Sequence, residues 1–495
     1  MAGSLDYAAL DTFKARLSGQ LDEFHIPGVM YAVIKDGQVE HIGGAGFRDL
    51  EERLAPDEDT RYCIGSCTKA MTAACLAILK DEGKLGWNDR IRKHWPAFQM
   101  KDDIAGQRTT IADALTHMTG IAGHDLAWYS APDYEGRTTE EYCRTIADLP
   151  PCSEPRSHYE YSNLMYTLLG YIVERVSGKP WSQFLEERIF APLGMTRSFA
   201  RIKGMDNDAN AARPYRFDGQ TLNRIPYYEV DAMGGCGVVT STAADMSKWV
   251  AFMLGDGSWQ GLRIINEETM RELRAPRVIP ESAKLPHTLQ TTYGFGWGGS
   301  AYRGHTRVNH GGAIDGFGCA VLLFPDDNMG VVTFGNADGS FAHGAAASAL
   351  ADLLLGVDDT DWFEFYNNAL DGMHAGLDKQ WADLLAKINP AAPPTHPLED
   401  YVGEYTAPGY GDINVSLTVD DGKDKLLVRY NGMPMPLTCV AYDAFLTHYC
   451  VDGAKMPLTL AFRMNLEGQV QSVEADMEPR VGPIKFERKK EEVNL

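Results

Sequence analysis

The stretch that most constrains this chain is residues 62–79, which holds Ser66 and Lys69 in the spacing S-x-x-K. It is the one S-x-x-K in the sequence, and a run of Ala, Leu and Met follows it directly. Most of those residues are strong helix formers, and residues three apart share a helix face. The pattern therefore predicts a buried helix that begins close to Ser66 and brings the Lys69 amine near the Ser66 hydroxyl.

A serine and a lysine in this relation can perform nucleophilic catalysis. Serine is a poor nucleophile until a base accepts its proton, and a lysine in an apolar wall, with its ammonium form disfavoured, can do so. The helix N-terminus also has unpaired N–H groups that can stabilise an oxyanion formed at the serine. The alternative interpretation is a serine near a helix start and a solvated lysine, which the apolar surroundings of Lys69 disfavour.

Length and charge limit the class of protein and its partners. A chain of 495 residues predicts two or three domains, or one large domain with an appendage. The net charge of −22 repels nucleic acid and anionic membranes. No uninterrupted apolar run approaches membrane-spanning length. We therefore expect no nucleic-acid partner and no membrane partner.

The N-terminus and the cysteines bear on the compartment. Residues 1–10 contain no basic region and no apolar core, so they do not read as a secretory signal. The nine cysteines are irregularly spaced, and neither C-x-x-C nor H-x-x-x-H occurs. We expect free thiols, no metal site, no cofactor and a cytoplasmic location.

The N-terminal three quarters of the chain alternate between helix and strand patterns. An amphipathic helix is predicted over residues 5–25, and two hairpins are predicted over residues 29–42 and 321–334. The second hairpin is apolar enough for central strands. Residues 293–297 and 308–317 are interpreted as neighbouring edge strands, and residues 345–355 as a helix packed on the sheet.

Tyr161 precedes a second apolar helix, which begins near residue 164. In one interpretation Ser162 or Asn163 simply caps that helix. In the other, Tyr161 projects from its loop toward Ser66. A phenol has a reference pKa near 10, so it needs a nearby cation such as Lys69 to serve as a base near neutral pH.

The composition changes after residue 388. Residues 389–397 are rich in proline and predict a linker, and strand-like alternation with Gly-containing turns follows it. The predicted domains are residues 1–388, which hold the motifs above, and residues 398–495, a small antiparallel barrel or sandwich. The C-terminal unit has no catalytic constellation, and covering a cleft or mediating homo-oligomerisation both remain open for it.

Three elements stand in order along the chain: Ser66-x-x-Lys69, Tyr161-x-Asn163 and His310-Gly311-Gly312. This order resembles the serine β-lactamase/penicillin-binding-protein superfamily, and in particular its class C β-lactamase-like branch with D-aminopeptidases and family VIII esterases. The resemblance implies an α/β (α+β) fold: an antiparallel sheet flanked by helices, plus an all-helical subdomain that holds Tyr161. The C-terminal barrel is similar to the lipocalin-like domain of some relatives.

The resemblance also implies a role for each motif. Ser66 would be the nucleophile that forms an acyl-enzyme, and Lys69 and Tyr161 would share the general-base work. Tyr161 would return a proton to the leaving group. Asn163 would hold Lys69 or a substrate amide.

The His310 motif would line the other side of the site. Gly311 and Gly312 would let substrate approach the strand, and the N–H groups of Ser66 and Ala313 would form the oxyanion hole. His310 occupies a position usually filled by lysine and is largely neutral at pH 7. That disfavours β-lactamase activity and favours esterase, amidase or D-aminopeptidase-like activity. A core histidine is the alternative interpretation.

These observations predict a serine hydrolase that cleaves a small ester, an amide or a short peptide. Acyl transfer to a metabolite hydroxyl or amine uses the same residues, so the sequence leaves it open. A binding protein that kept the fold is a further alternative, which the intact Ser66, Lys69 and Tyr161 disfavour.

Overall fold

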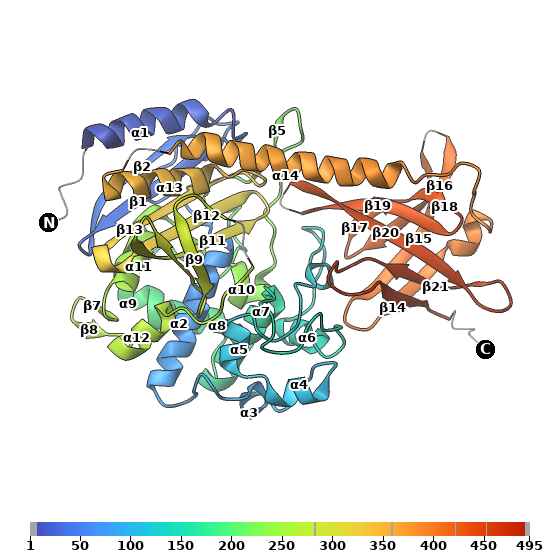
Figure 1. Cartoon of the computed structure of the whole chain (residues 1–495), viewed down its shortest axis with the longest axis horizontal. Helices are drawn as coiled ribbons and strands as arrows, with labels where there is room; N and C mark the ends of the chain where they lie inside the picture. The colour runs from blue at the N-terminus through green and yellow to red at the C-terminus, as the bar shows by residue number, and fades with distance from the viewer. Residues whose placement is uncertain (1–6, 282–283, 358–359, 421, 452, 491–495) are drawn as a thin grey trace.

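A seven-stranded antiparallel sheet forms the centre of the N-terminal unit (Figure 1). The computed structural model describes residues 7–281, 284–357, 360–420, 422–451 and 453–490. The strand order is β2-β1-β13-β12-β11-β10-β9. The strands are β1 (Gly28–Lys35), β2 (Gln38–Gly46), β9 (Thr288–Tyr293), β10 (Gly298–Tyr302), β11 (His305–Ile314), β12 (Phe317–Phe324) and β13 (Met329–Gly335).

Helices cover both faces of this sheet. On β1, Val29 and Tyr31 face α1 (Tyr7–Gln20) and α13 (Ala342–Leu355), whereas Met30 and Ala32 face the opposite core. Every residue of β1, β12 and β13 is buried. A strand buried on both faces has no solvent-facing positions, so its sequence reads as a continuous apolar run.

The second core belongs to α2 (Thr68–Asp81) and its neighbours. A short 3-10 turn, Gly65–Cys67, leads into α2, whose residues 68–79 are all buried. The helical subdomain beside it contains α3 (Ile91–His94), α4 (Asp103–Arg108), α5 (Ile111–Leu115), α6 (Thr139–Thr145), α7 (Asn163–Ser177) and α8 (Trp181–Leu185). The other helices are α9 (Ala191–Leu193), α10 (Gly234–Gly237), α11 (Ala243–Leu254) and α12 (Glu267–Arg274).

Three two-stranded sheets complete the N-terminal unit. They pair β3 (Tyr62–Cys63) with β6 (Thr240–Ser241), β4 (Tyr215–Phe217) with β5 (Leu222–Arg224), and β7 (Ser258–Trp259) with β8 (Leu262–Arg263). In the chain, β3 comes directly before the turn that carries Ser66, and its pairing with β6 anchors that turn.

The C-terminal unit is a nine-stranded, nearly closed antiparallel barrel, in the order β17-β16-β15-β14-β22-β21-β20-β19-β18. A tight turn at Asn431-Gly432, with φ of +46° and +78°, joins β16 to β17 as the sequence predicts. The strands are β14 (Gly403–Ala407), β15 (Gly411–Asp420), β16 (Lys423–Tyr430), β17 (Met433–Pro436), β18 (Thr438–Ala441), β19 (Ala444–Val451), β20 (Ala454–Met464), β21 (Val470–Ala475) and β22 (Ile484–Arg488).

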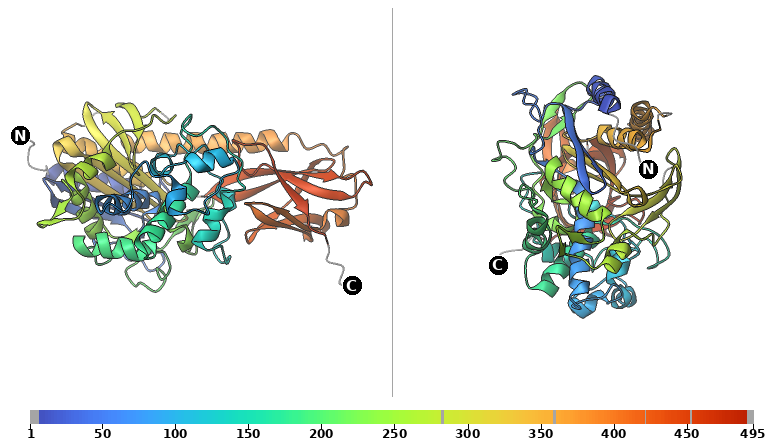
Figure 2. Two further views of the ribbon diagram at one scale, coloured as in Figure 1. Left: turned by 90° about the horizontal axis from the view of Figure 1, so that it is seen from below. Right: turned by 90° about the vertical axis from the view of Figure 1, so that its left-hand side faces the viewer.

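The helix α14 (Trp362–Leu385) runs from the N-terminal unit along the barrel (Figures 1 and 2). Its first residue is buried in the core beside α13, and near its other end the Trp381 ring packs against His448 of β19, 5.5 Å between centroids. The proline-rich residues 389–397 lie on the barrel: the Tyr442 N–H donates to the Ala392 carbonyl at 2.8 Å. The long helix therefore spans the distance between the two units.

The barrel also holds the loop that follows α5. Tyr430 donates its hydroxyl to the Leu126 carbonyl at 2.7 Å, and Asn431 donates to the Tyr129 carbonyl at 3.0 Å. The His124 N–H donates to the Glu478 carboxylate at 2.9 Å. Residues 124–131 are thus fixed from the C-terminal unit, a contact that sequence patterns did not indicate.

Most predicted elements are confirmed, and three details are wrong. Tyr293 ends β9 and residues 294–297 form the bend to β10, so residues 293–297 are not a strand, and β11 lies inside the sheet instead of at its edge. Ser162 is the N-cap of α7, but its side chain makes no capping hydrogen bond. By contrast, Thr242 caps α11 by accepting the Asp245 N–H at 3.1 Å. Residues 5 and 6 of the predicted first helix and turn residues 421 and 452 fall outside the described residues.

Within the described ranges, no helix combines the length and the apolar character that crossing a membrane requires. All nine cysteines are free thiols.

Candidate active site

Ser66 and Lys69 meet at the start of α2. The Lys69 Nζ lies 3.0 Å from the Ser66 Oγ, and it donates to the Asn163 Oδ1 at 2.8 Å and the Cys236 carbonyl at 2.9 Å. The lysine side chain is completely buried, and burial lowers its pKa from 10.5 to about 8. Two of its three contacts can only accept a hydrogen bond, so a neutral amine would point its lone pair at the Ser66 hydroxyl.

Tyr161 lies directly beside this pair. The Lys69 Nζ is 4.8 Å from the centre of the Tyr161 ring. Burial raises the pKa of Tyr161, and its hydrogen bond with Ser66 only partly opposes that shift. The phenol is therefore held in its neutral, proton-donating form, which differs from the expectation that a nearby cation would prepare it as a base.

His117 packs behind Tyr161. The two rings are 4.4 Å apart between centroids, and the His117 Nδ1 accepts the Ser162 N–H at 3.1 Å. Burial and nearby Lys69 hold the pKa of His117 well below its usual value, so it is a neutral acceptor. This contact positions the loop that carries Tyr161.

Two glycines allow β11 to approach the serine. A Cβ at Gly312 would lie 2.0 Å from the Ile64 carbonyl and 3.0 Å from the Ser66 nitrogen. A Cβ at Gly65, where φ is +49°, would lie 2.7 Å from the Ala313 nitrogen. Only glycine fits at such contacts. The backbone nitrogens of Ser66 and Ala313 are thereby brought to the same place.

His310 belongs to this strand, but its side chain is buried and is not among the residues that line the cavity at Ser66. Its Nε2 is 3.1 Å from the Tyr293 hydroxyl, and its Nδ1 contacts the Gly311 carbonyl at 2.5 Å. Burial, with a smaller contribution from Lys69, lowers the pKa of His310 to about 4. The ring is therefore a neutral, hydrogen-bonded support for β11.

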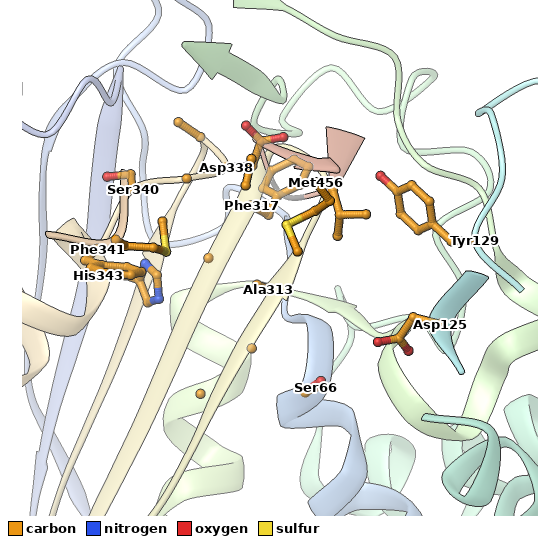
Figure 3. A pocket seen from close by; sticks show the side chains of 18 of the residues that line it. Ser66, Asp125, Tyr129, Ala313, Phe317, Asp338, Ser340, Phe341, His343 and Met456 are labelled. Carbon is orange, nitrogen blue, oxygen red and sulfur yellow. The ribbon is translucent and has the colours of Figure 1, made fainter. Parts of the chain in front are cut away.

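A cavity of about 580 Å³ opens above Ser66 (Figure 3). Five of the predicted site residues line it, whereas Lys69 and Asn163 lie beneath its floor. Those five are Ser66, Tyr161, Gly311, Gly312 and Ala313.

The C-terminal unit, together with α14, supplies one wall of this cavity. Tyr449 and Val451 come from β19, Ala454 and Met456 from β20, and Met373 from α14. In Figure 3 the Met456 side chain lies between Asp338 and Tyr129, across the cavity from Ser66. The barrel hairpin thus covers the space in which a substrate of Ser66 would lie.

Asp125 is a pocket residue that sequence reasoning missed. Its Oδ1 accepts from the Asn163 Nδ2 at 3.2 Å and from the Trp128 Nε1 at 3.0 Å, which orients the Asn163 amide so that its oxygen faces Lys69. The Asp125 side chain is exposed to the cavity, but the protein around it excludes bulk water, and this desolvation raises the pKa of the carboxyl group. A lone aspartate in a loop carries no pattern that could have indicated this role.

The donor set does not suggest a metal. Across the part of the chain that the structure describes, no three His, Cys, Asp or Glu side chains group closely enough to hold an ion.

The sheet with helices on both faces, the helical subdomain and the buried S-x-x-K serine define a protein of the β-lactamase fold class. Residues 13–355 match the family model described as Beta-lactamase, and residues 388–488 match the Domain of unknown function (DUF3471). The first match covers well over half of the chain, so this protein belongs to the beta-lactamase family, whose members are serine hydrolases.

Two fungal relatives match this chain along both its N-terminal and its C-terminal unit. The chain is 29% identical over 500 residues to "Unguisins hydrolase ungD'" of Aspergillus campestris, covering 95% of this chain and 90% of the relative. It is 27% identical over 513 residues to "Unguisins hydrolase ungD" of Aspergillus violaceofuscus, covering 96% and 89%. "Protein flp" of Staphylococcus aureus is 26% identical over 323 residues, covering 65% of this chain and 62% of that one.

Solved structures share the fold at lower identity. The octameric penicillin-binding protein homologue from Pyrococcus abyssi aligns with a TM-score of 0.63 at 22% identity, over 97% of this chain and 100% of that one. A D-stereospecific amidohydrolase from Streptomyces aligns with a TM-score of 0.59 at 21% identity, over 70% of this chain and 99% of that one.

Proposed function

We propose that this protein hydrolyses an amide or ester of a small molecule or short peptide through an acyl-enzyme on Ser66. The observation that carries the proposal is the Lys69 amine, 3.0 Å from the Ser66 Oγ, buried, and held by two acceptors that leave its third position to the serine. A lysine with a pKa of about 8 is partly neutral near pH 7 to 8, which suits a general base.

In the proposed acylation, the Ser66 Oγ attacks the substrate carbonyl carbon and its proton passes to the Lys69 Nζ. The oxyanion accepts hydrogen bonds from the N–H groups of Ser66 and Ala313, each contributing about 3 kcal/mol to lowering the barrier. The C–N or C–O bond then breaks, the leaving group takes the Tyr161 proton, and Lys69 returns its proton to Tyr161.

Deacylation repeats these steps with water. Water adds to the acyl carbon and gives its proton to Lys69, and the Ser66 Oγ leaves with a proton as the carboxylic acid is released. An alcohol or amine acceptor in place of water would make the same enzyme an acyltransferase. Hydrolysis is favoured because two relatives that span both units are named as hydrolases.

Residues 398–495 would form a second, lipocalin-like domain after a catalytic domain of residues 1–388 and a linker of residues 389–397. The hairpin residues Tyr449 and Met456 in the cavity wall support a role for this domain in selecting the substrate. The bonds from Tyr430 and Asn431 to the loop at residues 124–131 support a role in shaping the site.

The test is to incubate the protein with a series of p-nitrophenyl esters and with the β-lactam nitrocefin, following product release and intact mass together. We expect one acyl increment per chain on Ser66, rapid turnover of short esters, and no increment in the Ser66→Ala variant. Labelling that persists in Ser66→Ala would reject the nucleophile.

Nitrocefin and added acceptors sharpen the result. Efficient nitrocefin hydrolysis would contradict the weak β-lactamase activity that the neutral His310 implies. An acyl-enzyme that is stable in water and discharges only when an alcohol or amine is added would replace hydrolysis with acyl transfer.

A further inference from the structure

The charges on the cavity wall are of one sign. Two carboxylates, Asp125 and Asp338, line the cavity, and no lysine or arginine is among its described lining residues. A lining histidine, His343, is neutral near pH 7 because burial lowers its pKa to about 4. The two carboxylates would repel a substrate carboxylate in this space, and no cation would bind it. They would instead attract a positively charged group.

Asp125 is placed to contact a ligand. Its Oδ1 accepts both of the side-chain hydrogen bonds described above, whereas its Oδ2 accepts none from the described residues. Figure 3 shows the carboxyl group turned into the cavity, on the same side as the Ser66 hydroxyl. The path from Ser66 Oγ through Lys69 and Asn163 to Asp125 contains only three contacts, of 3.0, 2.8 and 3.2 Å.

Asp338 is a second carboxylate at the cavity with an oxygen that no described residue pairs. Its side chain is 1% exposed, Arg216 donates to its Oδ2 at 2.6 and 2.9 Å, and its Oδ1 has no hydrogen-bond partner in the described ranges. The same guanidinium also pairs with Asp315 at 3.0 Å. One arginine therefore serves two carboxylates, and this wall keeps a net negative charge.

From this geometry we infer that the substrate carries a protonated amine close to its scissile carbonyl, and that the Asp125 Oδ2 binds this ammonium group. The inference rests on the proposed acyl-enzyme function and adds the class of substrate. The wall at Asp338 and Asp315 contributes an attractive field behind it.

The binding partner of Asp125 must come from the substrate because the nearby lysine is already committed. Lys69 is engaged by Ser66, Asn163 and the Cys236 carbonyl, and it has to lose its charge to accept the serine proton. At that moment the carboxylate of Asp125 has no cation beside it. A substrate ammonium group would neutralise the charge of Asp125, and its own positive charge would favour the uncharged form of Lys69.

The experiment compares two ligands that differ in one charge. Alaninamide of either hand, with a free amine, and N-acetylalaninamide compete with p-nitrophenyl acetate for acylation of Ser66 at pH 7. We expect alaninamide of one hand to compete at least about tenfold more tightly in the wild-type protein, as a charge-assisted hydrogen bond requires. Asp125→Asn, which keeps an oxygen to accept from Asn163 and Trp128, should reduce this preference by about 10- to 100-fold.

Asp133→Asn is the matched control, because it removes the same charge from an exposed residue eight positions along the same loop and outside the cavity lining. It should leave the preference unchanged. A merely structural role of Asp125 would weaken both ligands equally and leave their ratio intact, which would overturn the inference. Equal competition by the two ligands in the wild-type protein would also overturn it.

The two proposals fail separately. If p-nitrophenyl acetate acylates Ser66 normally while the amine preference is absent, only the amine inference is wrong. If no acylation occurs, the proposed function is wrong, and calorimetric titration with the same two ligands still measures the preference for the amine.

Discussion

The two large antiparallel sheets of this protein differ in how many of their faces are buried. In the seven-stranded sheet, helices cover both faces and strands such as β1 and β12 have no exposed residue. In the barrel, strands alternate: along β22, Ile484 and Phe486 are buried whereas Lys485 and Glu487 are exposed. A sheet with one face outside its own core can pack the side chains of that face against another unit. In the barrel, β19 and β20 do this at the cavity beside Ser66.

The two regions also differ in the roles proposed for them: the N-terminal unit holds the catalytic residues, and the barrel helps to select the substrate. The groups that would move protons, Ser66, Lys69 and Tyr161, all come from the N-terminal unit, and the barrel contributes only wall residues and loop contacts. Loss of a hydroxyl should therefore be severe in one region and mild in the other. Substitutions in the two regions should differ in how strongly they change turnover.

Tyr161→Phe should lower turnover about 10²- to 10⁴-fold, because it removes the proton donor to the leaving group and leaves the ring packing intact. Steady-state kinetics with an anilide substrate measure the effect, and circular dichroism checks the fold. An activated ester, whose leaving group needs no proton, should be affected much less. Near-normal anilide turnover would remove Tyr161 from the mechanism.

The pH dependence of kcat/KM should show an acid limb with a pKa of about 8, because burial lowers the pKa of Lys69 from 10.5 and only the neutral amine accepts a proton. Below that pH the rate should fall about tenfold per unit, and above it the rate should level. A pH–rate profile with an uncharged ester measures this limb. A rate already level at pH 6, or one that falls as the pH rises through 8, contradicts Lys69 as the base.

Met456→Ala should change substrate selection more than chemistry, because this side chain lies across the cavity from Ser66. We expect KM for bulky acyl groups to change about tenfold, with acylation by p-nitrophenyl acetate nearly unchanged. Met464→Ala, at the other end of β20 and away from the cavity, is the control. Equal effects of the two substitutions would mean that the hairpin is only a structural cover.

Tyr430→Phe should have the smallest effect, a reduction of a few-fold in kcat/KM and a loss of about 1 kcal/mol in stability, because it deletes the hydroxyl that donates to the Leu126 carbonyl and, at a longer 3.1 Å, to the Tyr410 carbonyl. Tyr405→Phe deletes a similar buried bond, to the Tyr401 carbonyl, wholly within the barrel. Kinetics and thermal unfolding of both variants measure the difference. If the two variants lose stability alike and neither changes kcat/KM, the barrel does not tune the site through this loop.

Local patterns predicted much of the fold because their causes are local. The alternation of apolar residues, the Asn431-Gly432 turn and the helix behind Ser66 each depend on neighbours within a few positions. The errors arose where tertiary contacts decide. Residues 294–297 bend because Tyr293 of β9 pairs with Gly298 of β10, and the Ser162 side chain makes no capping hydrogen bond although its type and position fit.

For the candidate site, the pairing of Ser66 with Lys69 follows from the local sequence, because a spacing of three on a helix places both side chains on one face. Every contact between distant segments depends on the folded chain. Only folding brings Asp125 to Asn163, turns His310 away from the cavity, and lays Tyr449 and Met456 of the barrel over Ser66. The pKa values of Lys69 and Tyr161 belong to the same group, since burial sets them and burial is a property of the whole fold.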